Sequence, residues 1–558
     1  MKYLIIGGVA GGATTAARIR REDENGEIII FERGEFISYA NCGLPYYIGG
    51  TIKERGDLLV QSVTGFSNRY DIDVRTFCEV RSINVMAKTV SIVNTLNGKS
   101  YIESYDRLLL SPGAEPFRPK ISGIDSPKIL TLRNIPDTDR IKNMVSEKKA
   151  RRVVIAGGGF IGLEMADNLK HLGLDVTIVE MADQVMAQLD PPMASIVHYE
   201  LRSKGVKLLL KEAVSAFSEK NDELLVELKS GKSISTDLVI WSIGVKPDSG
   251  LAKEAGLPTG VTGGIVVNEY LQTGDENIYA TGDAIEVINP VTGKPAHIPL
   301  AGPANKQARI AADNMVHGNI CKYKGTIGTG IAKVFEITAA TTGVNEKILN
   351  REGIKYLTSI THSNSHAGYY PGTFPLSIKL LYTPEKGELL GAQVVGYGGV
   401  DKRIDMIATV LGMGGTVYDL MEIEHAYAPP FSSAKDPVNI AGFVADNILK
   451  GKMKIVTWDV ADNLDPEKDF LLDVRSGEEF REGAINGAIN IPLEDVRFRL
   501  DEIPEHKRII VYCAIGMRGY LASRILLQNG YTEVYNLTGG YKTYIYASID
   551  ANQQPTHL

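Results

Sequence analysis

The chain opens with two apolar runs separated by a glycine-rich turn and a helical segment. Residues 2–6 and 27–31 are apolar runs that predict short buried strands, and residues 13–21 predict a helix. The turn before the helix reads Gly7-Gly8-Val9-Ala10-Gly11-Gly12, and the second strand ends at Glu32. Strand, glycine turn, helix, strand and acid in this order are typical of a dinucleotide-binding unit. Because Val9 replaces the middle glycine of the GxGxxG pattern, this turn alone is a weak indication.

The same pattern recurs further along the chain. Residues 152–156 and 175–179 predict strands, and a helix is expected at 161–172. The turn Gly157-Gly158-Gly159-Phe160-Ile161-Gly162 fits GxGxxG at all three positions, and Glu180 closes the second strand. An acid at this place repels a 2′-phosphate, and Met181 and Ala182 follow it with no arginine. We therefore predict two bound dinucleotides and favour NADH over NADPH as the nicotinamide cofactor.

A third segment indicates which nucleotides are bound. Residues 273–283 match the pattern T-x5-[YF]-A-x-G-D, and residues 108–114 and 240–244 are strand-to-turn segments. These pieces, in this order, resemble the α/β flavoproteins that carry two dinucleotide-binding domains. The resemblance covers roughly residues 1–325. It implies that FAD uses the first glycine turn and Asp283, and that the nicotinamide nucleotide uses the second turn.

The remainder of the chain resembles two further domains. Strand-like runs at 331–335, 376–382 and 389–395 and a helix near 404–411 resemble the α+β dimerisation domain of pyridine nucleotide-disulfide reductases. After residue 450, the segments 470–475, 483–492, 513–518 and 537–541 resemble an α/β rhodanese domain, with Ala484 where such domains often carry His. We therefore expect an FAD domain at 1–150 and 261–325, an NAD(P)H domain at 151–260, a dimerisation domain at 326–450 and a rhodanese domain at 451–558.

Composition narrows the possible partners. The 558 residues are 44% apolar and 23% charged, as in an ordinary multidomain globular protein. A net charge of −7 argues against a nucleic-acid partner, and no apolar run is long enough to span a membrane. The four cysteines, Cys42, Cys78, Cys321 and Cys513, are scattered and have neither disulfide-framework nor metal-site spacing. We expect a cytoplasmic protein without a bound metal.

Cys42 is the first candidate for chemistry. It stands in the segment 38–47, with no second cysteine nearby. Gly43 and Pro45 suit a turn into a helix, which would place Cys42 at the positive end and lower the pKa of its thiol. The alternative is a small buried apolar cysteine.

The segment around Cys42 resembles the single-cysteine branch of the flavin disulfide reductases, which includes coenzyme A-disulfide reductase, NADH oxidase, NADH peroxidase and persulfide reductase. The dithiol branch needs a second cysteine about five positions away, where this chain has Ile37 and Tyr47. The resemblance implies that electrons pass from NADH through FAD to Cys42, which forms a mixed disulfide or a persulfide with a substrate sulfur. Peroxide- and oxygen-reducing members carry a His where this chain has Ala10, so a thiol-derived substrate is favoured.

The same resemblance implies further site residues. Tyr369 and Tyr427 would donate hydroxyl protons to the departing sulfur from the other subunit of a homodimer, although ordinary packing is an alternative for each, and Tyr370 is an alternative to Tyr369. Coenzyme A would contact Thr14, Arg18, Arg21, Ser38, Asn41, His297, Tyr370 and Lys435. Arg18 and Arg21 lie on one helical face, which could instead be a solvated basic surface. The cofactors would contact Gly7, Gly8, Val9, Ala10, Gly11, Gly12, Glu32, Arg33, Asn41, Cys42, Pro112, Gly113, Gly157, Gly159, Phe160, Ile161, Gly162, Glu180, Gly244, Gly282, Asp283 and Ala301.

The second candidate for chemistry is the loop from Cys513 to Arg518. A six-residue loop after a strand curls its backbone N–H groups around the sulfur, which favours a thiolate and its persulfide. The loop is shorter than those of related phosphatases, so it suits sulfane sulfur better than a phosphate monoester. The alternative is a rhodanese domain kept only for structure.

These observations together predict a flavoprotein that reduces coenzyme A persulfide or polysulfide, and coenzyme A disulfide, with NADH. Cys42 would reduce the sulfur that Cys513 collects or passes on. Two rivals stay open, an NADH oxidase or peroxidase and a non-reductive sulfur carrier or redox sensor. The sequence does not rank disulfide against persulfide, and it assigns no role to Cys78 or Cys321.

Overall fold

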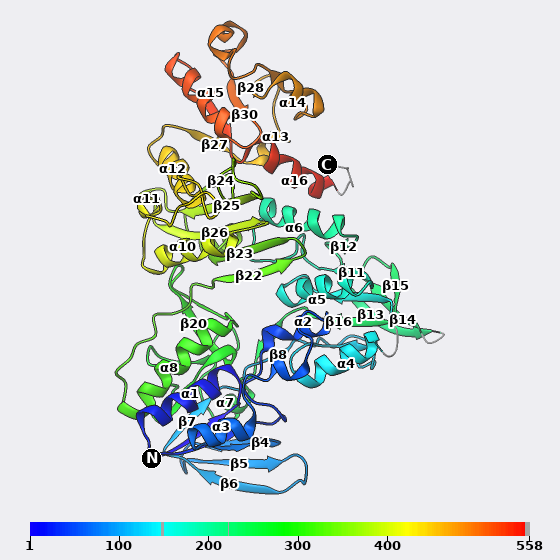
Figure 1. The fold of residues 1–558 in the computed structure, drawn as a ribbon, viewed down its shortest axis with the longest axis vertical. Coiled ribbons are helices and arrows are strands. Elements are labelled where there is room, and N and C mark those ends of the chain that lie inside the picture. Colours follow the sequence, from blue (N-terminus) through cyan, green and yellow to red (C-terminus); the bar gives the residue numbers. More distant parts are fainter. Residues whose placement is uncertain (147–149, 221–222, 553–558) are drawn as a thin grey trace. The chain divides into compact units, whose positions relative to one another are not determined.

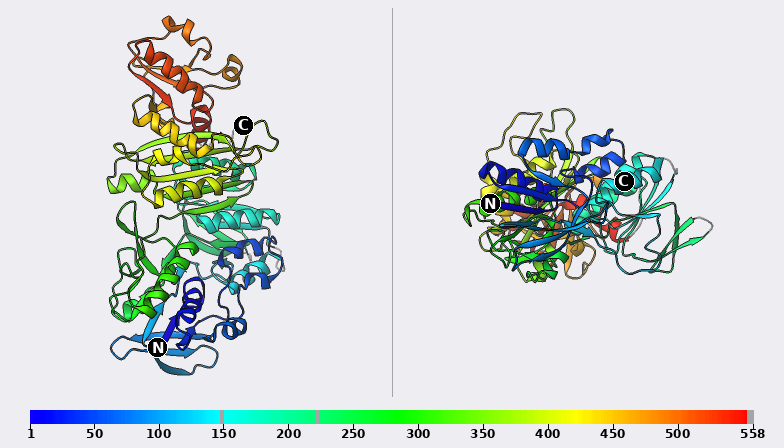
Figure 2. Two further views of the ribbon diagram at one scale, coloured as in Figure 1. Left: turned by 60° about the vertical axis from the view of Figure 1, so that its left-hand side comes forward. Right: turned by 90° about the horizontal axis from the view of Figure 1, so that it is seen from below.

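The computed structural model describes residues 1–146, 150–220 and 223–552 (Figure 1). The chain forms two compact units, each described here by itself. Unit 1 contains residues 1–183 and 206–328, and unit 2 contains residues 184–205 and those from 329 onward. The views in Figure 2 follow the same elements by colour.

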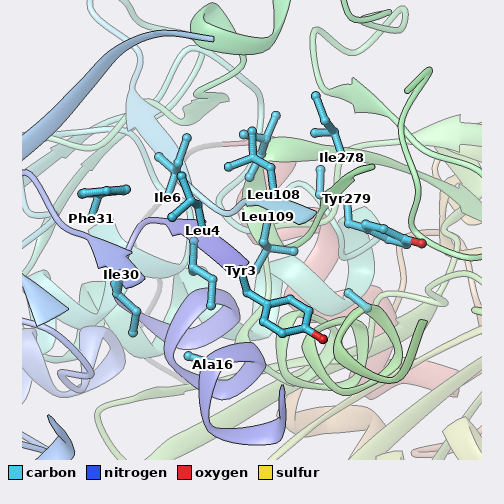
Figure 3. Close-up of a cluster of buried hydrophobic side chains, with 14 of the residues drawn as sticks. Tyr3, Leu4, Ile6, Ala16, Ile30, Phe31, Leu108, Leu109, Ile278 and Tyr279 are labelled. Atoms are coloured by element: carbon cyan, nitrogen blue, oxygen red, sulfur yellow. The ribbon is translucent and has the colours of Figure 1, made fainter. Parts of the chain in front are cut away.

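The first sheet of unit 1 is parallel and has the strand order β19-β7-β1-β2-β3. Its strands are β1 (Lys2–Ile6), β2 (Glu27–Phe31), β3 (Asp73–Arg75), β7 (Arg107–Leu110) and β19 (Ile278–Ala280). Helix α1 (Ala10–Glu22) packs against α8 (Ala301–His317). Tyr3, Leu4 and Leu108 are fully buried in this core, which Figure 3 shows. Strands β1 and β19, which are far apart in the sequence, thus lie in one sheet on either side of β7. Each pair of parallel neighbours is joined by a crossover connection rather than by a hairpin.

The second sheet of unit 1 is also parallel and has the order β12-β11-β10-β16-β9. Its strands are β9 (Ile129–Leu130), β10 (Arg152–Ala156), β11 (Asp175–Val179), β12 (Lys207–Leu209) and β16 (Leu238–Trp241), and α5 (Phe160–His171) follows β10. The predicted strands at 152–156 and 175–179 are therefore confirmed. Strand β9 joins this sheet although it precedes residue 150.

Smaller elements complete unit 1. Its other strands are β4 (Cys78–Asn84), β5 (Thr89–Asn94), β6 (Ser100–Ser104), β8 (Ala114–Pro116), β13 (Val214–Lys220), β14 (Glu223–Leu228), β15 (Ser233–Thr236), β17 (Val245–Pro247), β18 (Ile265–Val266), β20 (Ile285–Asn289) and β21 (Lys294–Ala296). Its other helices are α2 (Leu44–Ile48), α3 (Val63–Tyr70), α4 (Ile135–Ser146) and α7 (Gly250–Glu254), with short 3₁₀ turns η1 (Asn41–Gly43), η2 (Arg55–Leu58) and η3 (Gly282–Ala284).

Unit 2 begins with an antiparallel sheet of order β22-β23-β26-β25-β24. Its strands are β22 (Gly330–Val334), β23 (Ile337–Gly343), β24 (Leu357–Asn364), β25 (Pro375–Tyr382) and β26 (Leu389–Gly396), and its helices are α9 (Glu346–Glu352), α10 (Val400–Gly412), α11 (Val417–Glu422) and α12 (Pro437–Leu449). Helix α6 (Pro191–Ser203) also belongs to unit 2, because its buried N-cap Asp190 pairs with Lys379 (2.9 Å) and accepts from Gln393 (2.7 Å) in this sheet.

The last part of unit 2 is a parallel sheet of order β27-β31-β30-β28-β29. Its strands are β27 (Lys454–Val456), β28 (Asp469–Asp473), β29 (Ile489–Asn490), β30 (Arg508–Tyr512) and β31 (Val534–Leu537). Its helices are α13 (Trp458–Ala461), α14 (Gly477–Glu482), α15 (Met517–Gln528) and α16 (Gly540–Asn552), with turns η4 (Val496–Phe498) and η5 (Leu500–Glu502). Helix α16 contacts α6, where Asp550 meets the buried His198 (2.5 Å) and Arg202 (2.8 Å).

Candidate functional site

The first glycine turn is built so closely that only glycine fits at its key positions. Gly7 has a φ of +95°, and a Cβ on it would lie 2.2 Å from the Ser111 carbonyl oxygen. A Cβ on Gly12 would lie 1.8 Å from the Gly7 oxygen. The Glu32 carboxylate accepts hydrogen bonds from the N–H groups of Gly8 (2.9 Å) and Gly34 (2.8 Å). The turn therefore brings bare backbone to the start of α1, as pyrophosphate binding requires.

The second glycine turn repeats this construction. Gly157 has a φ of +104°, and its Cβ would lie 2.4 Å from the Ser242 carbonyl oxygen. A Cβ on Gly162 would lie 2.0 Å from the Gly157 oxygen. The Glu180 carboxylate accepts from Gly158 (2.7 Å) and Ala182 (2.8 Å), as Glu32 does in the first turn. Unit 1 therefore contains two glycine turns of the same construction. They are called here the first cradle (residues 7–12 with Glu32) and the second cradle (residues 157–162 with Glu180).

The surroundings of the first cradle fit a large polar cofactor. The hydroxyl of Thr281 is fully buried beside Gly11 and has no hydrogen-bond partner in the described part of the chain. Burial raises the pKa of the neighbouring Asp283, and His297 and Arg133 offset this in part. The His297 ring nitrogen lies 2.8 Å from the Asp283 carbonyl oxygen. An unpartnered buried hydroxyl and a partly desolvated carboxylate are the groups that a bound FAD would satisfy.

Cys42 lies in turn η1, immediately before α2, and it is exposed. Partial desolvation by the surrounding chain raises the pKa of the Cys42 thiol, and the carboxylates of Glu164 and Asp283 raise it further. The predicted position of Cys42 just before a helix is confirmed, but the predicted lowering of its pKa is wrong, because burial and the carboxylates of Glu164 and Asp283 outweigh the five-residue α2. The expectation that Cys42 is a small buried cysteine is also excluded.

Sequence reasoning missed Glu164, which lies on α5. Burial raises the pKa of this carboxyl group to about 7, with a smaller contribution from Asp167. The Tyr46 hydroxyl donates to it over 3.4 Å. Glu164 is thus an ionisable group that titrates near neutral pH within electrostatic reach of Cys42. An acid inside an otherwise apolar helix stretch, following the glycine turn, was the available signal.

The predicted coenzyme A residues of unit 1 are only partly brought together. The N–H of Ser38 donates to the Gly8 oxygen (2.8 Å), so Ser38 lies beside the first cradle, near Asn41. The Thr14 hydroxyl donates to Asn305 (2.8 Å). Arg18 pairs with both Glu22 and Asp313 at 2.7 Å. Arg18 is therefore already neutralised within the chain, whereas Arg21 is exposed on the same helix.

Tyr369 and Tyr427 meet in unit 2. Their hydroxyl oxygens are 3.1 Å apart, and the residues are 76% and 48% exposed. This hydrogen bond raises the pKa of Tyr369. Tyr370 is also exposed, with its ring against His366, and Lys435 is exposed as well.

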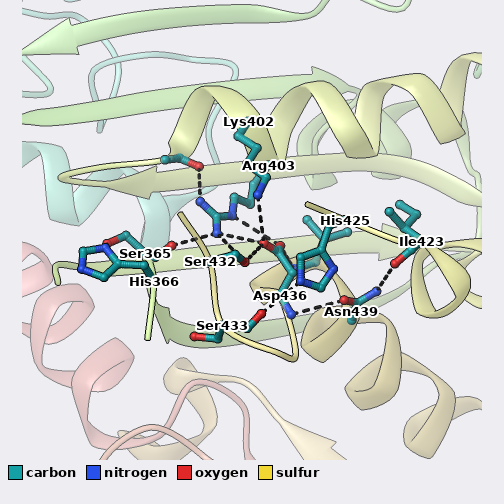
Figure 4. Close-up of polar contacts among 12 residues, drawn as sticks. Ser365, His366, Lys402, Arg403, Ile423, His425, Ser432, Ser433, Asp436 and Asn439 are labelled. Atoms are coloured by element: carbon teal, nitrogen blue, oxygen red, sulfur yellow. Dashed lines mark hydrogen bonds and ion pairs between the residues drawn. The ribbon is translucent and has the colours of Figure 1, made fainter. Parts of the chain in front are cut away.

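A buried ion pair fixes the two segments that carry these tyrosines (Figure 4). The Arg403 guanidinium, 1% exposed, donates to the Ser365 carbonyl oxygen and to the Asp436 carboxylate, both at 2.8 Å. Ser432 donates to the same carboxylate (2.6 Å), and Asp436 also caps α12. Burial alone would raise the pKa of Asp436, but the hydrogen bonds from Ser432, Val438 and Arg403 lower it. One arginine thus holds the segment before Tyr369 against the segment after Tyr427.

The rhodanese-like loop is wound around a buried sulfur. Cys513 is 1% exposed, and its Sγ accepts from the N–H of Gly516 (3.1 Å), which has a φ of +102°. The N–H of Tyr541 donates to the Cys513 oxygen (2.8 Å), and a Cβ on Gly540 would lie 2.4 Å from that oxygen. Arg518 makes a double hydrogen bond to Glu479 (2.6 and 2.7 Å). Glu479, like Arg403 and Asp436, has a role that only long-range contacts reveal.

The other two cysteines have no comparable setting. Cys78 is buried, with its sulfur 3.8 Å from Asn94 and Tyr101. Cys321 is partly buried, 4.0 Å from Asp313. Within the described residues, no helix has the length and apolar character needed to cross a bilayer.

Comparison with known proteins agrees with this construction. Residues 1–307 match the pyridine nucleotide-disulphide oxidoreductases, residues 330–437 match their dimerisation domain, and residues 458–547 match the rhodanese-like domain. A coenzyme A disulfide reductase of Staphylococcus haemolyticus is 37% identical over 447 residues, which are 80% of this chain and all of the relative.

Solved structures extend the similarity over the rhodanese-like part. The reduced CoADR-RHD of Bacillus anthracis has 51% identity and a TM-score of 0.96, and the alignment covers 98% of both chains. The NAD-dependent persulfide reductase of A. fulgidus has 40% identity and a TM-score of 0.92, covering 98% of this chain and 100% of that one. A water-forming NADH oxidase of Lactobacillus brevis has 26% identity and a TM-score of 0.78, over 81% of this chain and 99% of its own.

The predicted fold class and the predicted relationship are confirmed by these matches. The chain belongs to the pyridine nucleotide-disulphide oxidoreductase family, among the coenzyme A disulfide reductases, and carries a rhodanese-like domain at residues 458–547.

Proposed function

We propose that the protein uses FAD and NADH to reduce the sulfane sulfur of coenzyme A persulfide or polysulfide to thiol and sulfide, and that it also reduces coenzyme A disulfide. The observation that carries the proposal is Cys42, an exposed cysteine with no second cysteine close to it in the sequence. It lies in the unit that holds both nucleotide cradles. The relatives named coenzyme A disulfide reductase and persulfide reductase support the substrate class.

The first cradle, with Glu32 and Asp283, would hold FAD, and the second, with Glu180, would hold NADH. When bound, these two groups supply the electron pair for the reduction. Glu180 favours NADH because its carboxylate, anchored by Gly158 and Ala182, occupies the place where a 2′-phosphate would need a cation.

Cys42 acts as the nucleophile. With coenzyme A persulfide the exchange is Cys42–S⁻ + CoA–S–S–H → Cys42–S–S⁻ + CoA–SH, and two electrons and one proton then release HS⁻ and restore Cys42–S⁻. With coenzyme A disulfide, Cys42 forms a mixed disulfide and one coenzyme A thiolate leaves. Burial disfavours the Cys42 thiolate, and the charges of Glu164 and Asp283 disfavour it further, so the attack depends on the protonation state of Glu164.

The tyrosine pair acts on the departing sulfur. Phenol hydroxyls that hydrogen-bond to each other can pass a proton to a leaving thiolate. We propose that Tyr369 and Tyr427 do this from the partner subunit of a homodimer, with Tyr370 and Lys435 binding coenzyme A. Both residues are exposed within their own unit, and residues 330–437 match a dimerisation domain. Cys513 would collect sulfane sulfur or pass it on.

The rival function is oxygen or peroxide reduction, which the similarity to an NADH oxidase favours. Ala10, in the first glycine turn, has no acid–base group for that chemistry. The test is NADH oxidation by the holoenzyme, measured without oxygen with coenzyme A disulfide or hydrogen peroxide and measured in aerated buffer with neither, compared with Cys42→Ser. We expect turnover with the disulfide only, abolished by the substitution. Turnover with peroxide or oxygen alone would support the rival, and no multiple turnover with any substrate would support a carrier or sensor.

A further inference from the structure

The two arginines near Cys513 each form an ion pair with a carboxylate. Arg518, at the end of the loop and within hydrogen-bonding reach of the Cys513 sulfur, is bound twice by the Glu479 carboxylate. Arg475, 4% exposed, is bound by the fully buried Asp473 at 2.7 and 3.0 Å. The four loop residues at 514–517, Ala-Ile-Gly-Met, carry no charge. The loop therefore offers backbone N–H groups to a ligand but no net positive side-chain charge.

Lys542 is a third basic residue near the loop, but its side chain lies in a separate cavity. Lys542 donates its backbone N–H to the Ala514 oxygen (3.0 Å). Its side chain lines a separate small cavity, of about 30 Å³, together with Tyr199 and Tyr546. Burial lowers the pKa of this ammonium group. Lys542 therefore does not supply the charge that Glu479 removes from Arg518.

Glu479 is held in this role by local structure. Besides binding Arg518, its carboxylate accepts the N–H of Ser476 (2.9 Å) in the capping box of α14. The hydrogen bond from Arg518 lowers the pKa of Glu479 to about 2. The carboxylate is therefore ionised over the whole working pH range, and Arg518 stays neutralised.

The surroundings of the sulfur also restrict the shape of a donor. Cys513 is 1% exposed, so only a terminal sulfur atom can reach it easily. The loop and the first turns of α15 expose apolar side chains, namely Ile515 (43%), Met517 (62%) and Leu521 (44%). An organic group attached to the donor sulfur would contact these apolar side chains. A small dianion would meet the same apolar side chains and no unpaired cation to bind its charge.

We propose that the Cys513 loop takes sulfur from an organic persulfide and discriminates against thiosulfate, and that Glu479 sets this choice by masking Arg518. The proposal rests on the proposed role of Cys513 as a carrier of sulfane sulfur. An organic persulfide carries at most one negative charge at its reacting end, whereas thiosulfate carries two, and an unpaired dianion is rejected by a neutral site.

The transfer step balances without a further reactant. The Cys513 thiolate attacks the terminal sulfur of R–S–S–H, a new S–S bond forms, and the old S–S bond breaks. The leaving sulfur takes the bonding electron pair and the proton, so Cys513–S⁻ + R–S–S–H gives Cys513–S–S⁻ + R–SH. No net oxidation occurs, and no electrons from NADH are needed.

The test uses the full-length holoenzyme without NADH, in the Cys42→Ser background so that only Cys513 reports. The donors are glutathione persulfide and thiosulfate at low ionic strength, and kcat/KM is measured for sulfur transfer to cyanide. Glu479→Gln keeps the acceptor for Ser476 but removes the negative charge. The matched control is Asp469→Asn, which removes the charge from a similar double hydrogen bond to Arg508. Asp469 and Arg508 stand at the first residues of β28 and β30, whereas Cys513 follows the last residue of β30.

We expect the parent protein to prefer glutathione persulfide, and Glu479→Gln to raise kcat/KM for thiosulfate about 10- to 100-fold, the range for one unmasked charged hydrogen-bond donor. Activity with the persulfide should persist, which shows that the variant is folded, and Asp469→Asn should leave the donor ratio unchanged. Equal use of both donors by the parent, or an unchanged ratio in Glu479→Gln, would overturn the inference while leaving Cys513 as a sulfur carrier. Transfer from neither donor would overturn the carrier role itself.

Discussion

The hydroxyl oxygens of Tyr369 and Tyr427 lie 3.1 Å apart, although 58 positions separate the two residues in the chain. Both residues are exposed to solvent within their unit. The buried Arg403 binds the Ser365 carbonyl oxygen, four residues before Tyr369, and the Asp436 carboxylate, nine residues after Tyr427. A solvent-facing pair of phenols on a rigid buried support is suited to act on a ligand that arrives from outside this unit.

Replacing Tyr427 with phenylalanine should lower kcat for coenzyme A disulfide reduction about 100-fold, because the departing thiolate loses its proton donor. The substitution removes only the hydroxyl, so NADH binding should not change. Steady-state kinetics of NADH oxidation measure the effect. Tyr418→Phe, on another exposed tyrosine of the same unit, is the control and should keep full activity. Equal rates for both variants would exclude a proton-donating role for Tyr427.

Replacing Arg403 with leucine should lower the free energy of unfolding by about 3–5 kcal/mol, because the buried Asp436 charge and the Ser365 carbonyl group lose their partner. Urea unfolding measures this loss. Arg499→Ala removes a double hydrogen bond to Glu502 at the solvent-screened surface and should leave the free energy of unfolding nearly unchanged. Similar losses in both variants would mean that Arg403 does not brace the tyrosine segments.

Replacing Glu164 with glutamine should lower the pKa of Cys42. The Glu164 carboxyl group has a pKa of about 7, so above that pH its negative charge opposes the Cys42 thiolate, and glutamine removes this opposition. The measurement is the pH dependence of Cys42 alkylation, followed by mass spectrometry of its peptide. The profile should move to lower pH in Glu164→Gln and stay in place in Glu24→Gln, an exposed acid of the same unit. A shift to higher pH would contradict this account.

His362 should make the protein less stable in acid. Its ring is buried between Ser377 and Thr543, at 2.8 Å from each hydroxyl, and burial lowers its pKa to about 3. In the unfolded chain the pKa is near 6.5, so between these values the unfolded state binds the extra proton and stability falls as pH falls. At pH 5 the loss relative to neutral pH is about 2 kcal/mol. Urea unfolding at both pH values should show this loss in the parent and a smaller one in His362→Gln.

Local patterns predicted most of the fold. The glycines of both cradles, Glu32 and Glu180 stand at fixed places relative to their strands, so spacing alone identified them. The pKa of Cys42 was not predictable, because Glu164 and Asp283 come from distant segments. For the same reason the sequence did not reveal that Arg18 is neutralised by Asp313, or that Glu479 binds Arg518. Periodicity describes faces of single elements, whereas these contacts depend on how elements pack.

The most direct test of the central claim is the amount of sulfide released for each NADH oxidised when the holoenzyme reduces coenzyme A persulfide without oxygen. The account predicts one sulfide and one coenzyme A thiol per NADH, with kcat/KM at least as high as for coenzyme A disulfide, and no release by Cys42→Ser. NADH oxidation without sulfide, or undiminished sulfide release by Cys42→Ser, would contradict the claim that Cys42 reduces sulfane sulfur.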